Sequence, residues 1–284
     1  MVSLHVEATS RCTLACPRCE RTELSNKFSN FKVGDLDISA FDNFLDMDID
    51  KINFCGNLGD PIYHRRFLDL VELAVTKSKH INITTNGSKK NIGWWSSLNK
   101  LLRSSDSVTF SIDGTPDNFT QYRINGDWKS VLVGIKECVK GPAITEWKCI
   151  PFKFNENTLH EVEQLSNDLG IDHFLLDPSD RWIDNDPLKP EGYTSPRPTS
   201  LDTKQIQEQC GNNKMHFIGA DGFYTPCCYS KHFKWYYKSN WWKNKHMHDI
   251  KLTKLSEQIR HFTEFYSTIQ TERYNYCVYN CGKY

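Results

Sequence analysis

The sequence predicts an α/β fold in which strands and helices alternate to form most of a (β/α) barrel. Short apolar runs with strand character alternate with amphipathic segments of helical spacing. The connections between them are short, which predicts parallel strands joined by right-handed crossovers. Six strands and five helices fit into the first 180 residues or so, fewer than the eight repeats of a complete barrel. A doubly wound open sheet is the alternative.

The predicted strands are short and rich in β-branched and aromatic residues. The first, 3–8, leads into a loop that contains cysteines. The others follow at 51–55, 80–85, 107–113, 145–154 and 172–177.

Helices are predicted between these strands. The first, 36–47, has Asp37 or Ser39 as its candidate N-cap. The last, 158–170, ends at Gly170, a residue suited to a helix C-terminus. The other three are 67–78, 94–102 and 127–139.

The composition changes after Asp177, where Pro, Asp and Ser become frequent. We therefore predict a barrel domain over 1–180, a linker or crossing segment over 181–209, and a small domain over 210–284. The last of these is expected to contain a hairpin around Ala220–Gly222 and a helix over 254–269.

Charge and cysteine content restrict the classes of function. Lysine plus arginine equals aspartate plus glutamate at 35 each, which gives no argument for bulk binding to nucleic acid or an anionic membrane. No apolar run approaches the ~18 residues of a membrane span, and the first residues do not resemble a secretion signal. Eleven cysteines in such a chain predict metal or cluster chemistry in a reducing cytoplasm.

Three of these cysteines, Cys12, Cys16 and Cys19, follow the first predicted strand with the spacing C-x3-C-x2-C. A disulfide scaffold would need an even number, and a structural zinc site usually has two cysteine pairs or a Cys/His quartet. Three thiolates are typical of an iron–sulfur cluster with one open corner. The loops after the next three strands (Gly56–Pro61, Asn86–Gly87 and Asp113–Gly114) should meet these cysteines at one rim, where parallel βα folds carry their active sites.

With these motifs the chain resembles the radical S-adenosylmethionine (radical SAM) enzymes over essentially its whole length. The loop "GNLGDP" resembles the Gly-Glu-Pro motif of that family, with Asp60 in place of glutamate, and Arg18 stands where the family often has an aromatic residue. The resemblance implies that Cys12, Cys16 and Cys19 hold a [4Fe–4S] cluster whose open iron binds SAM. SAM is then cleaved to a 5′-deoxyadenosyl radical that abstracts hydrogen from a substrate. A zinc or ferredoxin-like site is the alternative.

The resemblance also implies a SAM-binding set. Gly56, Gly59 and Asp60 would bind the methionine amino group, largely through the backbone. Ser111 and Arg123 would bind the SAM carboxylate, and Asp113 the ribose hydroxyls. The alternatives are a surface ion pair for Arg123 and an ordinary strand-end hydroxyl for Ser111.

Five further cysteines lie near the C-terminus. Cys210, Gly222 and Cys227 have spacings that resemble the opening of a SPASM domain, and the small cysteine number resembles its shortened Twitch form. This implies an auxiliary [4Fe–4S] cluster held by Cys210, Cys227, Cys277 and Cys281, with Cys228 as a packed thiol. A structural zinc at the same four thiolates is the alternative. The remaining cysteines, Cys55, Cys138 and Cys149, are predicted to be buried in the core.

Residues 231–248 interleave aromatic residues with lysines, a pattern seen in grooves for single-stranded nucleic acid. Because the net charge gives no support, we favour a segment that packs its rings on the barrel near the site. His246 and His248 are possible ligands there, although surface histidines are commoner.

The resemblance implies an oxidoreductase supplied with electrons by a flavodoxin- or ferredoxin-type donor. Its substrate would be a small polyol, amino sugar or nucleotide, or else a ribosomal peptide. The first strand starts at residue 3, which leaves no evident N-terminal peptide-recognition domain and favours a small molecule or an unassisted peptide. The terminal "CGKY" lacks the Gly-Gly-Arg tail of the molybdopterin-precursor cyclase, so that activity is not expected. An iron–sulfur electron carrier or a zinc-stabilised binding module is the non-enzyme alternative.

Overall fold

The structure is a computed structural model. It describes residues 2–28, 33–179, 181–183, 185–193, 205–206, 215–261, 277 and 282–283, with the backbone alone at 205–206, 215, 235 and 282–283.

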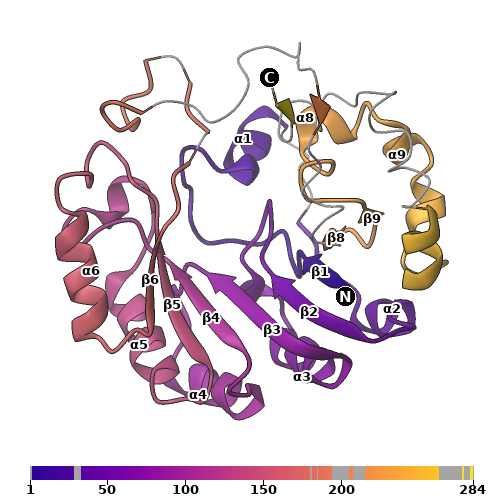
Figure 1. Ribbon diagram of the computed structural model, residues 1–284, viewed down its shortest axis with the longest axis horizontal. Coiled ribbons are helices and arrows are strands. Elements are labelled where there is room, and N and C mark those ends of the chain that lie inside the picture. The colour runs from indigo at the N-terminus through magenta and orange to yellow at the C-terminus, as the bar shows by residue number, and fades with distance from the viewer. Residues whose placement is uncertain are drawn as a thin grey trace.

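An eight-stranded sheet dominates the described residues (Figure 1). Its strand order is β6-β5-β4-β3-β2-β1-β8-β9, and every neighbouring pair is parallel except β8 and β9. The strands are β1 (Ser3–Val6), β2 (Ile49–Phe54), β3 (Ser78–Thr85), β4 (Ser107–Ser111), β5 (Ile144–Cys149), β6 (His173–Leu176), β8 (Met215–Ile218) and β9 (Tyr224–Thr225). A separate antiparallel pair joins β7 (Gln205–Ile206) to β10 (Gly282–Lys283).

The helices between the strands lie on the outer side of this curved sheet (Figure 1). They are α2 (Ile38–Phe44), α3 (Phe67–Lys77), α4 (Ile92–Leu101), α5 (Trp128–Cys138) and α6 (Leu159–Asp168). From β1 to β6 the strand order advances in one direction, and right-handed crossovers then place all the helices on one face. A doubly wound sheet needs a reversal of that order, so the open-sheet alternative is wrong.

All six predicted strands and five predicted helices are present, and both helix-end signals are confirmed. Asp37 is the N-cap of α2, accepting hydrogen bonds from the backbone N–H groups of Ser39 and Ala40. Gly170 follows α6 with a φ of +80°, a conformation that favours glycine. The predicted strand 145–154 ends early, at Cys149, because the chain turns at Pro151 and the side chain of Asn155 accepts from Phe152 N at 2.7 Å.

Two elements differ from the prediction. Helix α1 (Glu20–Lys27), which begins directly after the cysteine loop, was not predicted. The predicted hairpin is confirmed as β8 and β9, but β8 also pairs in parallel with β1, with His216 opposite Leu4. A segment assigned to the C-terminal domain thus extends the barrel sheet, and the three-part division of the chain stays a prediction.

The C-terminal segment beyond β9 is built from short elements. These are α8 (Phe233–Tyr236), α9 (Asn240–Lys243), a 3-10 turn over Lys245–His248, and helical residues 255–261, which form the described part of the helix predicted over 254–269.

The two faces of the sheet differ in polarity because side chains alternate along each strand. The outer face forms the core against the helices, with residues such as Leu4, Ile52, Ile83, Phe110 and Trp147 fully buried. Cys138 and Cys149 belong to this core as predicted, whereas Cys55 is partly exposed.

The inner face is polar from strand to strand. His5, Asn53 and Asn82 lie in register across β1, β2 and β3. The Asn82 amide donates to Thr109 Oγ1 at 2.9 Å, and that hydroxyl donates to Glu146 Oε2 at 2.6 Å. This hydrogen-bonded wall faces the concave side of the partial barrel.

Candidate active site

The cysteine loop leaves the carboxyl end of β1 and is braced on both sides. Ala15 N donates to Ile124 O at 3.0 Å, which joins the loop to the segment after β4. The Arg21 guanidinium, from α1, donates to Cys12 O at 2.7 Å. Cys19 N bonds back to Cys16 O at 3.1 Å, and α1 starts at the next residue. These hydrogen bonds fix the shape of the loop.

The three cysteine side chains gather in one small apolar cluster. Cys16 is buried with Leu14, Tyr122 and Phe152, and Cys12 and Cys19 pack against this group. Nitrogen donors also approach the sulfurs. Leu14 N lies 3.4 Å and Asn86 Nδ2 3.5 Å from Cys12 Sγ.

These features fit an iron–sulfur cluster, whose potential depends on burial and on hydrogen bonds to its sulfurs. Among the residues that the structure describes, no three His, Cys, Asp or Glu side chains converge on a point that could hold one metal ion. A cubane cluster does not require such convergence, because each thiolate binds a different iron.

Burial controls the protonation of these thiols. It raises the pKa of Cys12 to about 12, with the Asp60 carboxylate as the next cause. It raises the pKa of Cys16 to about 11, although Arg123 acts in the opposite direction. Both thiols are therefore protonated at neutral pH until a metal displaces the protons.

The loop Gly56–Pro61 packs directly on the start of the cysteine loop. A Cβ atom on Gly59 would lie 1.7 Å from Thr9 O, so only glycine allows this approach. Asp60 N donates to Arg11 O at 2.9 Å, and Leu58 N donates to Glu7 Oε1 at 2.6 Å.

The carboxylate of Asp60 is buried and occupied by protein donors. It accepts from Asn86 N at 2.6 Å and from Thr85 Oγ1 at 2.8 Å, both at the end of β3. Burial raises its pKa to about 6, against the effect of these hydrogen bonds. The side chain thus holds the glycine loop to the end of β3.

Arg123 and Asp113 form an ion pair, with 2.6 Å between Arg123 Nε and Asp113 Oδ2. Asp113 is fully buried, and the Arg123 side chain is 16% exposed. The alternative considered for Arg123 was a surface ion pair: an ion pair is present, but it is buried. Ser111 ends β4 on the inner face, in register with Lys148 of β5.

Two buried glutamates at this edge were not predicted as site residues. Glu7 accepts from Leu58 N and, at 3.5 Å, from Ala220 N, so it joins the glycine loop to the turn between β8 and β9. Glu20 accepts from Phe233 N at 2.8 Å, and burial raises its pKa to about 7. The hydrogen-bond partners of these glutamates are 51 to 213 residues away in the sequence, so no local sequence pattern indicates that the glutamates belong to this site.

The predicted auxiliary cluster is described only in part. Cys210 and Cys281 lie outside the described residues, and Cys277 is buried. Cys228 interacts with the side chain of His5 on the inner face of β1, and its carbonyl accepts from Asn57 Nδ2 at 3.0 Å. Cys227 O accepts from Ser230 Oγ at 2.6 Å. The four-cysteine assignment stays a prediction.

The lysines and aromatic residues of 231–248 contact one another. Lys231 Nζ lies 4.0 Å from the centroid of the Tyr236 ring, and Lys245 Nζ lies 3.9 Å from that of Trp242. His248 is buried and hydrogen-bonded to Gln258, while His246 is exposed. The alternation in sequence therefore produces cation–π contacts within the segment.

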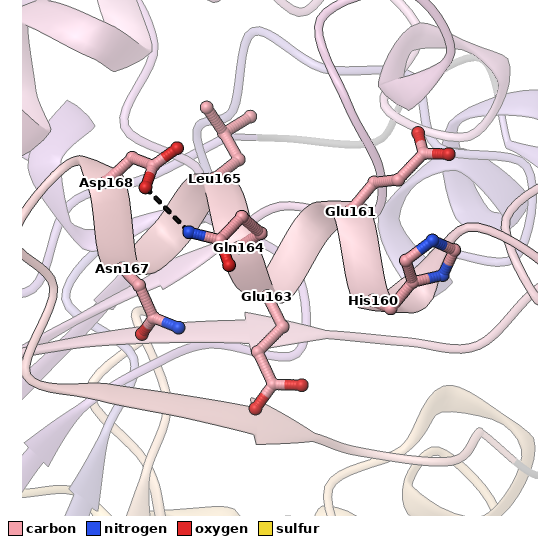
Figure 2. Close-up of a pocket in the computed structure, with 7 residues that line it drawn as sticks. All are labelled: His160, Glu161, Glu163, Gln164, Leu165, Asn167 and Asp168. Atoms are coloured by element: carbon pink, nitrogen blue, oxygen red, sulfur yellow. Dashed lines mark hydrogen bonds between the residues drawn. The ribbon is translucent and has the colours of Figure 1, made fainter.

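A hollow on the surface lies elsewhere, along α6 (Figure 2). It is lined by side chains of that one helix, among which Gln164 donates to Asp168 at 2.8 Å. It lies on the outer helix layer, whereas the cysteines lie at the carboxyl ends of the strands. Within the described part of the chain, no helix has both the length and the apolar character needed to cross a membrane.

Comparisons with known proteins identify the fold. No family model matches the chain. A curated relative from Pyrococcus furiosus, the tungsten-containing aldehyde ferredoxin oxidoreductase cofactor-modifying protein, is 31% identical over 121 residues. That match covers 41% of this chain and 32% of the relative, about a third of its length.

Three solved structures share the architecture. The structure of anSMEcpe with bound AdoMet has a TM-score of 0.58 and 14% identity, covering 80% of this chain and 74% of that one. Streptococcus suis SuiB bound to S-adenosylmethionine has a TM-score of 0.58 and 13% identity, covering 84% and 64%. BtrN in complex with AdoMet and 2-DOIA has a TM-score of 0.50 and 14% identity, covering 100% and 93%. The predicted partial (β/α) barrel is thereby confirmed.

Proposed function

We propose that this chain is a radical SAM enzyme whose Cys12, Cys16 and Cys19 hold a [4Fe–4S] cluster. The observation that carries the proposal is the gathering of three cysteine side chains at the carboxyl ends of parallel strands, with N–H donors at their sulfurs. Solved structures of this fold contain S-adenosylmethionine. When bound, the cluster supplies the electron for reductive cleavage of SAM and so permits hydrogen abstraction from an unactivated C–H bond.

In this proposal the loops around the cysteines bind SAM. The backbone of Gly56, Gly59 and Asp60 receives the methionine amino group, and the Asp60 carboxylate holds that loop to β3. The Arg123 nitrogens not bound to Asp113, together with Ser111, receive the carboxylate. Both Asp113 oxygens already accept protein hydrogen bonds, so a ribose hydroxyl would have to share one of them.

We further propose that the chain carries an auxiliary [4Fe–4S] cluster on Cys210, Cys227, Cys277 and Cys281, which accepts an electron or anchors the substrate. The burial of Cys277 and the attachment of the β8–β9 turn to Glu7 support a cluster close to the barrel.

The polar inner wall, from His5 to Glu146, favours a polar substrate. A small polyol, amino sugar or nucleotide fits this wall. A peptide is the second candidate, because a structure of this fold is known with a precursor peptide. Electrons would come from a flavodoxin- or ferredoxin-type donor.

The decisive experiment is SAM cleavage by the full chain. Protein reconstituted anaerobically with iron and sulfide, then given dithionite and SAM, should release 5′-deoxyadenosine, which mass spectrometry detects. Replacing Cys12, Cys16 and Cys19 together by Ala should abolish the product. Cys138→Ala, which removes a core thiol on α5, should retain it. Cleavage by the triple variant would refute the assignment.

A further inference from the structure

A buried carboxylate lies behind the cysteine cluster. Asp113 follows β4, is fully buried, and accepts hydrogen bonds on both oxygens. Its Oδ1 accepts from Ile150 N at 2.8 Å, and its Oδ2 accepts from Arg123 Nε at 2.6 Å. The carboxylate is therefore held from β5, and it holds the Arg123 guanidinium in one orientation.

The guanidinium so fixed lies beside the cysteine cluster. The segment 122–124 is tied to the cysteine loop by the bond from Ala15 N to Ile124 O. Tyr122 packs against Cys16, and the Arg123 guanidinium carbon lies 5.5 Å from the centroid of the Tyr122 ring. Burial raises the pKa of the Cys16 thiol, and the positive charge of Arg123 is the main opposing influence, so the two groups interact electrostatically while Nε binds Asp113. Arg123 is thus a neighbour of the cluster site through Tyr122, independently of any contact with SAM.

We infer that Arg123 and Asp113 together set the reduction potential of the cluster on Cys12, Cys16 and Cys19. This role rests on the proposed function and is separate from any contact between Arg123 and SAM. Reduction adds one negative charge to the cluster, and a buried cation beside the cluster stabilises the reduced form more than the oxidised form. Arg123 raises the potential, and the Asp113 charge partly offsets it.

The two members of the pair should therefore act in opposite directions. Arg123→Gln removes the cation and leaves the Asp113 charge uncompensated, so reduction should become roughly tenfold less favourable, a fall of about 59 mV for one electron. Asp113→Asn keeps an oxygen for Ile150 N and removes the negative charge, so the potential should rise. Arg123→Lys keeps the charge and should shift the potential less than Arg123→Gln does.

A matched control lies at the opposite end of the same strand. Arg103 pairs with the fully buried Asp106 just before β4, with 2.9 Å between Arg103 Nη2 and Asp106 Oδ1. Arg103→Gln breaks an ion pair of the same kind, far from the cysteine loop along β4. It should lower thermal stability and leave the potential unchanged.

The test is a potentiometric titration of the reconstituted full chain without SAM, followed by electron paramagnetic resonance. The relevant signal is the one lost when Cys12, Cys16 and Cys19 are all replaced by Ala. A lower potential for Arg123→Gln with a higher one for Asp113→Asn supports the inference. Equal potentials, shifts of the same sign, or a shift as large in Arg103→Gln would overturn it. An unmodified protein that assembles no such cluster would instead refute the proposed function.

Discussion

The carboxylate of Asp60 accepts a hydrogen bond from the backbone N–H of Asn86 at 2.6 Å, and this bond joins the loop after β2 to the end of β3. Asn86 in turn donates to the sulfur of Cys12. A single buried carboxylate thereby fixes the glycine loop relative to the first cysteine of the candidate cluster site.

Asp60→Ala should be strongly destabilising. It leaves the Asn86 N–H and the Thr85 hydroxyl without their acceptor in a buried site, which costs roughly 2–5 kcal/mol. Urea unfolding of the metal-free protein measures the loss. Asp69→Ala, which breaks an exposed ion pair with Arg66 on α3, should cost less than about 0.5 kcal/mol. Equal effects of the two substitutions would contradict the role given to Asp60.

Gly59→Ala should disrupt the contact between the two loops. The added methyl group would lie 1.7 Å from Thr9 O, and the backbone shift needed to relieve this should cost about 3 kcal/mol or more. SAM binding to the reconstituted protein should weaken as well. Gly93→Ala, where the nearest atom is 3.6 Å away, should be neutral or slightly stabilising. Denaturant unfolding and equilibrium dialysis with SAM report the two effects.

Protonation of His216 should limit stability in acid. The ring is buried in β8 with Nδ1 2.7 Å from the Tyr224 hydroxyl, and burial lowers its pKa from 6.5 to about 4. Between these values this residue binds more protons in the unfolded chain than in the folded one. The contribution of His216 to the free energy of unfolding is thus complete above pH 6.5. As the pH falls toward 4, roughly 3 kcal/mol of it is lost.

The pH dependence of urea unfolding in the unmodified protein and in His216→Asn tests this. Stability should depend less positively on pH in the variant than in the unmodified protein between these two pH values, because the buried Asp60 and Glu20, whose pKa values are raised, act in the opposite direction equally in both proteins. A slope that is the same in both proteins would assign the acid sensitivity to other groups.

The adjacent residues Cys227 and Cys228 should differ in iron binding. Cys228 interacts with His5 on the inner face of β1, and neighbouring side chains on an extended segment point in opposite directions. Cys227→Ala should therefore lower iron from about eight to about four atoms per chain, and Cys228→Ala should keep the higher number. Iron and sulfide assays with Mössbauer spectra distinguish them. The reverse pattern would exchange the assignments, and four irons with one zinc in the unmodified protein would refute the second cluster.

Much of the fold could be predicted because its signals are local. The alternation of strand and helix patterns, the Asp37 cap and Gly170 depend on residues within one element, and the C-x3-C-x2-C spacing lies within one loop. Parallel βα topology then brings the loops after the strands to one edge, so the neighbourhood of the cysteines and the glycine loop followed from the element order.

Tertiary structure alone decided which buried charges meet and where the sheet ends. Strand β8 pairs with β1 across about 200 residues of chain, and no short-range periodicity specifies such a partner. The sequence predicts Asp113 and Arg123 as separate SAM ligands, yet in the fold they form an ion pair with each other. The reason is that a buried carboxylate needs a cation or N–H donors nearby. For the same reason Glu7 joins the glycine loop to the β8–β9 turn, a relationship that depends on surfaces brought together by folding.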